Sequence, residues 1–281
     1  MPEHPIAEQS MSPRSSFMYG DHVRINGIRQ HYLRYGGRGR PLVLVPGITT
    51  PAILWGFVAE ILGRHLDVYV LDVRGRGLSE SGDHIGYGLD DCATDLIEFC
   101  AALGLVDAIW FGHSMGGRIV ARAATLDPAP AGLLVLADPP VSGPGRRPYP
   151  IHLNKYLDTL HPATRGLGYE AMKDTPWAPE LVRLRAEWMH TCYEPAIVAA
   201  WRSFHEDDIH GDLRDSVRPI RLMVAERGGV IQGPDIEELR SFGPHIEIAT
   251  VADCGHMIPF ENLSGFCAVL GRFLDLDLGT H

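Results

Sequence analysis

The sequence is poor in cysteine and has no cysteine pair at the short spacing of a metal or redox motif. Five cysteines are spread over most of the 281 residues, and none stands in a C-x-x-C pattern. An odd number of scattered cysteines is not the framework of a disulfide-stapled secreted domain. We therefore expect reduced thiols and a cytoplasmic location.

Long apolar runs are also missing. No stretch of about 18 apolar residues occurs, which is the length that a membrane-spanning helix needs. The opening stretch MPEHPIAEQSMSPRSSFM lacks the apolar core of a signal peptide. We expect no membrane association, and we expect residues 1–19 to form a flexible N-terminal extension.

Basic residues are outnumbered by acidic ones. The chain has 25 Lys and Arg against 35 Asp and Glu, and its formal net charge is -10. A nucleic-acid-binding surface needs Lys and Arg gathered on one face, whereas here they are scattered. We expect no nucleic-acid partner, and no pattern in the sequence specifies an oligomeric state. The remaining composition, 45% hydrophobic, is that of a globular domain of catalytic size.

Short apolar runs alternate with longer amphipathic segments along most of the chain. PLVLVPG, LDVYVLDVRG, DAIWFGHS and AGLLVLAD have the pattern of buried strands, and the segments between them have that of helices. Continuous apolar strands separated by helices indicate a parallel sheet covered on both faces. The earlier stretch VRINGIRQHYLRYG predicts an antiparallel hairpin that turns at Asn26 and Gly27. The sequence therefore predicts an α/β fold with a mostly parallel sheet.

The alternation stops over residues 139–218, where helical patterns follow one another without a strand-like run. Strand character returns in PIRLMVAE and IEIATVA. We name residues 139–218 the helical insertion and expect it to fold over one edge of the sheet as a cap. Residues 20–138 and 219–281 are then the core.

A serine stands in the pattern G-x-S-x-G, between a predicted strand and a predicted helix. Residues 112–116 read GHSMG. This arrangement is typical of a nucleophile elbow, in which the sharp turn crowds any Cβ at the two glycines. The serine then projects from the carboxyl end of the sheet, where ligands bind in such folds. Ser114 is the predicted nucleophile.

A serine hydroxyl is a weak nucleophile and needs a positioned base, usually histidine. The sequence has 14 histidines, so position must select among them. Elbow enzymes have the chain order serine, acid, histidine, and the histidine follows the last strand. His256, in VADCGHMIPFE, has that position and is the predicted base.

The acid that orients the histidine is harder to place. It usually follows the strand after the insertion, but there the sequence LMVAERGGVIQ has Gly228 at the expected position. Asp138 directly follows the strand GLLVLA, one strand nearer to the elbow, and is our preferred acid. Glu226 stays open as the rival, whereas Asp253 lies too close to His256 in sequence to face it easily.

Two backbone N–H groups are expected to form an oxyanion hole. One belongs to Met115, which follows the nucleophile at a helix N-terminus. The other belongs to Ile48 in the loop VPGITTP. In the stretch DVRGRGLS, we expect Asp72, Arg74 and Gly77 to brace the loops beside the site.

With elbow, oxyanion loop and late histidine in this order, the chain resembles the α/β-hydrolase family from about residue 22 to residue 275. Segments of the insertion, among them DPPVSGPGRR and RAEWMHTCYEPAIV, look like the N-formylmaleamate deformylases of nicotinate degradation. That resemblance implies Ser114, His256 and Asp138 as a catalytic triad. It also implies hydrolysis of N-formylmaleamate to maleamate and formate, with no metal and no cofactor.

A small-molecule carboxylate is then the expected substrate, and a guanidinium or a helix N-terminus should meet its charge. Arg202, with His205 nearby, is our preferred carboxylate-binding pair. Arg118 on the elbow helix is expected to be packed or exposed instead. The candidate arginines of the insertion are Arg146, Arg147, Arg165, Arg183, Arg185 and Arg202.

Other functions stay open. A carboxylesterase, an enol-lactone hydrolase or a carbon–carbon bond hydrolase of aromatic degradation would use the same triad and a similar cap. A hydrolase-like ligand receptor would keep the fold without turnover, but the intact serine, base and acid argue against it. Dehalogenases and epoxide hydrolases of this fold need an aspartate at the elbow, where this chain has Ser114.

Overall fold

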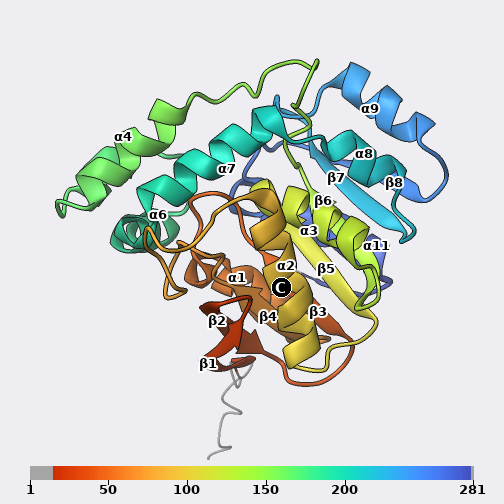
Figure 1. Ribbon diagram of the computed structural model, residues 1–281, viewed down its shortest axis with the longest axis horizontal. Coiled ribbons are helices and arrows are strands. Elements are labelled where there is room, and N and C mark those ends of the chain that lie inside the picture. Colours follow the sequence, from red (N-terminus) through yellow and green to blue (C-terminus); the bar gives the residue numbers. More distant parts are fainter. Residues whose placement is uncertain (1–14, 280–281) are drawn as a thin grey trace, which may run out of the picture.

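An eight-stranded sheet is the centre of the computed structural model, which describes residues 15–279 (Figure 1). The strand order is β1-β2-β4-β3-β5-β6-β7-β8. The two pairings at the β1 edge, β1 with β2 and β2 with β4, are antiparallel, and all the others are parallel. The predicted α/β fold with its mostly parallel sheet is confirmed. The strands are β1 (Phe17–Ile25), β2 (Ile28–Tyr35), β3 (Pro41–Val45), β4 (Asp67–Leu71), β5 (Ala108–His113), β6 (Ala131–Ala137), β7 (Ile220–Ala225) and β8 (Ile246–Val251).

Helices cover both faces of the sheet because the central strands are apolar on both sides. Every residue of β4 and β5 is buried. Along β3, Val43 and Val45 pack into one apolar cluster and Leu42 and Leu44 into the other, as the alternation of strand side chains requires. Burying one such side chain stabilises the fold by about 1.5–3 kcal/mol. The core helices are η1 (Ala52–Trp55), α1 (Gly56–Leu62), α2 (Leu89–Ala102), α3 (Met115–Leu126), α9 (Gly233–Ser241), α10 (Ile258–Glu261) and α11 (Leu263–Leu274).

The first hairpin turns where the sequence predicts it. Asn26 and Gly27 have φ of 41° and 73°, the left-handed backbone that tight hairpin turns require. The predicted flexible extension over residues 1–19 is wrong at its end, because Phe17–Tyr19 belong to β1. The ring of Phe17 packs edge-on against Tyr35 of β2, with ring centroids 5.2 Å apart. Residues 1–14 lie outside the described part of the chain.

The helical insertion lies between β6 and β7 and contains no strand in the structure. Helices α4 and α7 lie side by side at one edge of the molecule (Figure 1), and α6 contacts η1 of the core. The last helix, α8, contacts α3 and α9 of the core instead. Within residues 15–279, no helix combines the length and apolarity that crossing a membrane requires. The insertion comprises α4 (Leu153–Ala163), α5 (Gly168–Met172), α6 (Pro179–Trp188), η2 (Met189–Thr191), α7 (Glu194–Glu206) and α8 (Ile209–Arg214).

Candidate active site

Ser114 occupies a strained turn between β5 and α3. Its φ of 55° and ψ of -119° lie outside the regions that residues other than glycine usually adopt. A Cβ atom at Gly112 would lie 2.3 Å from the carbonyl oxygen of Gly116, and one at Gly116 would lie 1.9 Å from that of Val45. Both glycines are therefore required for β3, β5 and α3 to meet at this turn. The turn places Ser114 at the carboxyl end of the sheet.

Three residues from separate loops form a continuous hydrogen-bond chain. The Oγ atom of Ser114 lies 2.9 Å from Nε2 of His256, and Nδ1 of His256 lies 2.7 Å from Oδ2 of Asp138. A carboxylate only accepts hydrogen bonds, so Nδ1 carries the proton and Nε2 is free to accept one from the serine. Asp138 is fully buried and its Oδ1 accepts a further bond from the backbone N–H of Ala225. The structure thus brings Ser114, His256 and Asp138 together.

The rival acids lie elsewhere. Glu226 is exposed, and its Oε2 accepts a hydrogen bond from the backbone N–H of Asp253 at 2.9 Å. In the described part of the chain, neither the Glu226 carboxylate nor the Asp253 carboxylate has a hydrogen bond to His256. The geometry therefore favours Asp138 over Glu226 as the partner of the imidazole.

The loop that carries His256 is held by two side chains that the sequence did not single out. The buried ring of His113 donates from Nε2 to the carbonyl oxygen of His256 at 2.9 Å. Burial, with a smaller contribution from the charge of His256, lowers the pKa of His113 from 6.5 to about 3. The carboxylate of Glu261 accepts from the backbone N–H groups of Gly255 and Met257. His113 therefore stays neutral and fixes the position of the His256 backbone.

Met115 in the elbow and Ile48 in the loop after β3 are both buried. Neither backbone N–H has a hydrogen-bond acceptor among residues 15–279. Unpaired backbone N–H groups of this kind are suited to receive a developing negative charge.

Arg76 connects the two residues of the candidate oxyanion hole. Its Nε donates to the carbonyl oxygen of Ile48 at 3.1 Å, and its Nη2 contacts the sulfur of Met115 at 3.6 Å. Nη2 also donates to the carbonyl oxygen of Ala196 in α7, at 3.0 Å. Burial lowers the pKa of Arg76. Arg76 lies within the stretch DVRGRGLS but is not among the residues predicted from the sequence.

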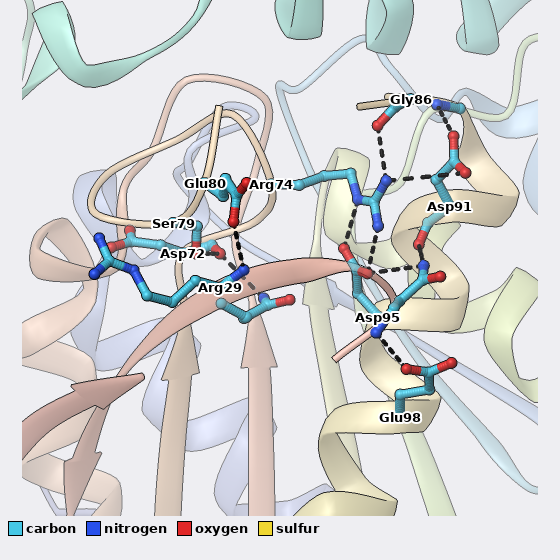
Figure 2. Close-up of polar contacts among 12 residues, drawn as sticks. Arg29, Asp72, Arg74, Ser79, Glu80, Gly86, Asp91, Asp95 and Glu98 are labelled. Carbon is cyan, nitrogen blue, oxygen red and sulfur yellow. Dashed lines mark hydrogen bonds and ion pairs between the residues drawn. The ribbon is translucent and has the colours of Figure 1, made fainter. Parts of the chain in front are cut away.

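The neighbouring residues of that stretch hold the loops beside the site. Figure 2 shows the guanidinium of Arg74 facing Asp95, to which it donates two bonds of 2.6 Å, and Gly86. Asp72 accepts a bond of 2.6 Å from the backbone N–H of Ala52, at the end of the oxyanion loop. A Cβ atom at Gly77 would lie 2.1 Å from the Asp72 carboxylate. These contacts fit the expected bracing role.

A cavity of about 660 Å³ opens above the elbow. Core residues supply its floor, and α4, α6 and the segment between α5 and α6 supply further walls. Its mixture of apolar walls and a few polar groups is typical of a small-molecule site. The lining includes Ile48, Thr49, Ser114, Tyr156, Trp177 and Arg185.

Two predicted substrate-binding residues do not reach this cavity. Arg202 is exposed on α7, whose buried face is formed by Ala196, Ile197, Ala200 and Phe204. His205 stacks on Trp201 and its Nδ1 contacts that residue's carbonyl oxygen at 3.0 Å. The structure contradicts the expectation that Arg202 and His205 bind the substrate, because α7 turns both away from the cavity lining.

The other arginine candidates differ in their contacts and exposure. Arg146 pairs with Glu238 and Arg147 with Asp235, whereas Arg165 and Arg183 are exposed. Of the six candidates, Arg185 is the one that lines the cavity in the described part of the chain. Arg118 was expected to be either packed or exposed, and the structure shows it packed and buried. It donates to the carbonyl oxygens of Pro140, Ser142, Ser203 and Asp207.

The chain is similar to known α/β hydrolases over most of its length. Residues 42–268 match the model of a family described as the alpha/beta hydrolase family. The N-formylmaleamate deformylase of Pseudomonas putida is 56% identical over 263 residues, which cover 93% of this chain and 98% of that protein. The pimeloyl-[acyl-carrier protein] methyl ester esterase of Vibrio cholerae is 24% identical and covers 86% of this chain and 97% of its own length.

Solved structures of other hydrolases superimpose on this chain over most of its length. The crystal structure of an N-formylmaleamic acid deformylase from Pseudomonas putida S16 superimposes with a TM-score of 0.86 at 48% identity, covering 90% of this chain and all of that one. The enol-lactonase from Burkholderia xenovorans superimposes with a TM-score of 0.74 at 18% identity, covering 91% of this chain and all of that one, and shows the shared fold. With the family model spanning most of its length, the chain belongs to the α/β-hydrolase family.

Proposed function

We propose that this chain is a hydrolase that cleaves the N-formyl amide bond of N-formylmaleamate, giving maleamate and formate. The observation that carries the proposal is the 56% identity, over nearly the full length of both chains, to a relative named for that reaction. An alignment over 93% of this chain spans the helical insertion, which forms much of the cavity wall. The serine and histidine that line the cavity supply the chemistry, together with the buried aspartate that binds the histidine.

In the proposed acylation step, Nε2 of His256 takes the hydroxyl proton of Ser114 while Oγ attacks the formyl carbon. Asp138 accepts the hydrogen bond from Nδ1 and stabilises the imidazolium that forms. The formyl oxygen becomes an oxyanion between the backbone N–H groups of Ile48 and Met115. Each such donor lowers the barrier by roughly 3 kcal/mol in a well-studied serine protease.

Collapse of the tetrahedral intermediate breaks the bond between the formyl carbon and the amide nitrogen. The nitrogen takes the proton from His256, and maleamate leaves. This nitrogen is conjugated to a second carbonyl, so it departs more readily than an amine would. Water then attacks the formyl ester of Ser114, with His256 again as the base, and releases formate.

We further propose that residues 139–218 act as a cap that encloses the substrate, over a core formed by residues 20–138 and 219–281.

Acyl transfer by a triad needs neither a metal nor a cofactor. The five cysteines are free and buried, which supports the proposal of a cytoplasmic location.

The test is release of formate from N-formylmaleamate by the purified protein, with simple ester and lactone analogues of the substrate run in parallel. We expect fast formate release and weak turnover of the esters and lactones. Brisk ester or lactone hydrolysis without formate would overturn the deformylase proposal and favour an esterase or an enol-lactone hydrolase.

A further inference from the structure

Arg185 extends from α6 to the oxyanion loop. Its Nη2 lies 3.4 Å from Oγ1 of Thr49, the residue after Ile48. The carbon at the centre of its guanidinium lies 4.9 Å from the centroid of the Trp177 ring, a distance at which cation and ring attract each other. Arg185, Thr49 and Trp177 line the same cavity as Ser114. A cation from the helical insertion is therefore held beside the proposed reaction centre.

The guanidinium of the half-buried Arg185 lacks the partners that the buried arginines of this chain have. Arg74 has Asp95, and Arg76 and Arg118 donate to backbone carbonyl oxygens. In residues 15–279, Arg185 has no carboxylate within salt-bridge distance, and its buried Nε has no hydrogen-bond acceptor. The contact with Thr49 is long for a hydrogen bond.

An unpaired guanidinium in a cavity is costly unless a ligand satisfies it. Burial lowers the pKa of Arg185, but arginine starts so high that the group stays charged at neutral pH. Tyr156 nearby is neutral, because burial raises its pKa to about 12, and its hydroxyl is bound to that of Tyr149. The charge of Arg185 is thus available to an anion that enters the cavity.

Other charged groups at the cavity are less suited to bind an anion. Lys155 and Asp174 are exposed, so water screens their charges. The carboxylate of Glu261 accepts from backbone N–H groups of the His256 loop. Among the cavity-lining residues, Arg185 alone presents a planar fork that matches a carboxylate with two parallel bonds.

We propose that Arg185 binds the carboxylate of the substrate and makes the enzyme selective for anionic amides. The carboxylate lies at the end of N-formylmaleamate opposite the formyl group. Its capture by α6 would hold the formyl carbon over Ser114 and its oxygen between the oxyanion donors. The identity of the substrate rests on the proposed function, whereas the need for a carboxylate rests on Arg185 itself.

The kinetic test compares Arg185→Met with two matched controls, Arg183→Met on the same helix and Arg202→Met on α7. Each variant is assayed on N-formylmaleamate and on neutral N-formylacrylamide, which lacks the carboxylate. We expect Arg185→Met to lower the ratio of kcat/KM for the anionic over the neutral substrate roughly 10- to 100-fold, the value of one charge-assisted contact. Arg185→Lys should lose less, and both controls should keep the wild-type ratio.

A binding measurement needs no turnover. Ser114→Ala protein is titrated with maleamate by calorimetry, alone and combined with Arg185→Met or Arg202→Met. We expect the combination with Arg185→Met to weaken binding by a similar factor and that with Arg202→Met to leave it unchanged. If Arg185→Met fails to fold, the lysine variant serves both tests.

An unchanged substrate ratio in Arg185→Met, or loss of selectivity in Lys155→Met instead, would overturn the inference. The two proposals fail separately. Formate release that is indifferent to Arg185 would leave the deformylase function and remove the carboxylate site. Arg185-dependent binding of maleamate without formate release would leave the carboxylate site and remove the deformylase function.

Discussion

A Cβ atom at Gly228 would lie 2.8 Å from the Oδ2 atom of Asp138. That oxygen is the one that accepts the hydrogen bond from Nδ1 of His256. The carboxylate at the end of β6 therefore occupies the space that a side chain after β7 would need. The glycine at the usual acid position is part of the site, because it leaves room for an acid supplied by the neighbouring strand.

Gly228→Ala should displace the Asp138 carboxylate and misalign His256. A shift of about 1 Å at a catalytic group can cost as much as roughly a hundredfold in rate, so we expect kcat to fall at least about tenfold. Gly233→Ala is the matched control, since a Cβ there meets no atom within 4 Å. Equal steady-state rates in the two variants would show that Gly228 is not needed to leave room for the Asp138 carboxylate.

Asp138→Asn should lower kcat by about ten-thousand-fold, as loss of the triad carboxylate does in a well-studied serine protease, because the amide favours the wrong imidazole tautomer. Glu226→Gln should change kcat little, since Glu226 bonds to the backbone of Asp253. Steady-state kinetics of both variants test the assignment. The reverse ranking would move the acid to Glu226.

Arg76→Met should act through the oxyanion loop, because Arg76 donates to the carbonyl oxygen of Ile48 and contacts the sulfur of Met115. We expect kcat to fall roughly 10- to 100-fold with a smaller change in KM, since the affected donors act mainly in the transition state. Arg76→Lys keeps the charge but not the planar fork and should recover only part of the loss. Arg64→Met, an exposed site, controls for loss of a cation. A rise in KM with unchanged kcat would show that Arg76 does not position the oxyanion donors.

His113 should make the stability of the fold sensitive to acid. Its pKa is lowered to about 3 in the native state, whereas in the unfolded chain it titrates near 6.5. Between these values the unfolded state binds a proton that the native state does not, so stability is full above pH 6.5 and is lost as pH falls toward 3.

Urea unfolding of wild type and His113→Gln from pH 7.5 to 4.5 measures this effect. As pH decreases, the free energy of unfolding of wild type should fall more steeply than that of His113→Gln. The difference in slope should correspond to the uptake of about one additional proton per molecule on unfolding. The imidazole NMR signal of His113 should not titrate over the same range. Parallel stability curves and a titrating signal would show that His113 is protonated in the folded protein.

Local sequence patterns were sufficient to predict the sheet, the elbow and the positions of Ser114, His256 and Asp138. Each of these follows from the order of strands and from residues next to their ends. Gly228 also signalled the displaced acid, because the absence of a carboxylate at one strand end directed attention to the next.

The residues that sequence reasoning missed, such as Arg76, or did not prefer among its candidates, such as Arg185, act through contacts between distant segments. Arg76 reaches α7, and Arg185 reaches the oxyanion loop, through packing that a helical pattern alone does not specify. Arg202 was preferred over Arg185 because the sequence shows which residues share a helix but not which face meets the cavity. Phe17–Tyr19 join β1 because β2 pairs with them, a tertiary contact that the polar start of the chain does not reveal.

The central claim is that Ser114 carries the formyl group from N-formylmaleamate to water. Its most direct test is formate release by wild type and by Ser114→Ala, prepared free of wild-type protein and compared by thermal unfolding. The account predicts rapid release by wild type, none above background by the variant, and similar unfolding midpoints. Comparable turnover by folded Ser114→Ala protein would contradict the mechanism.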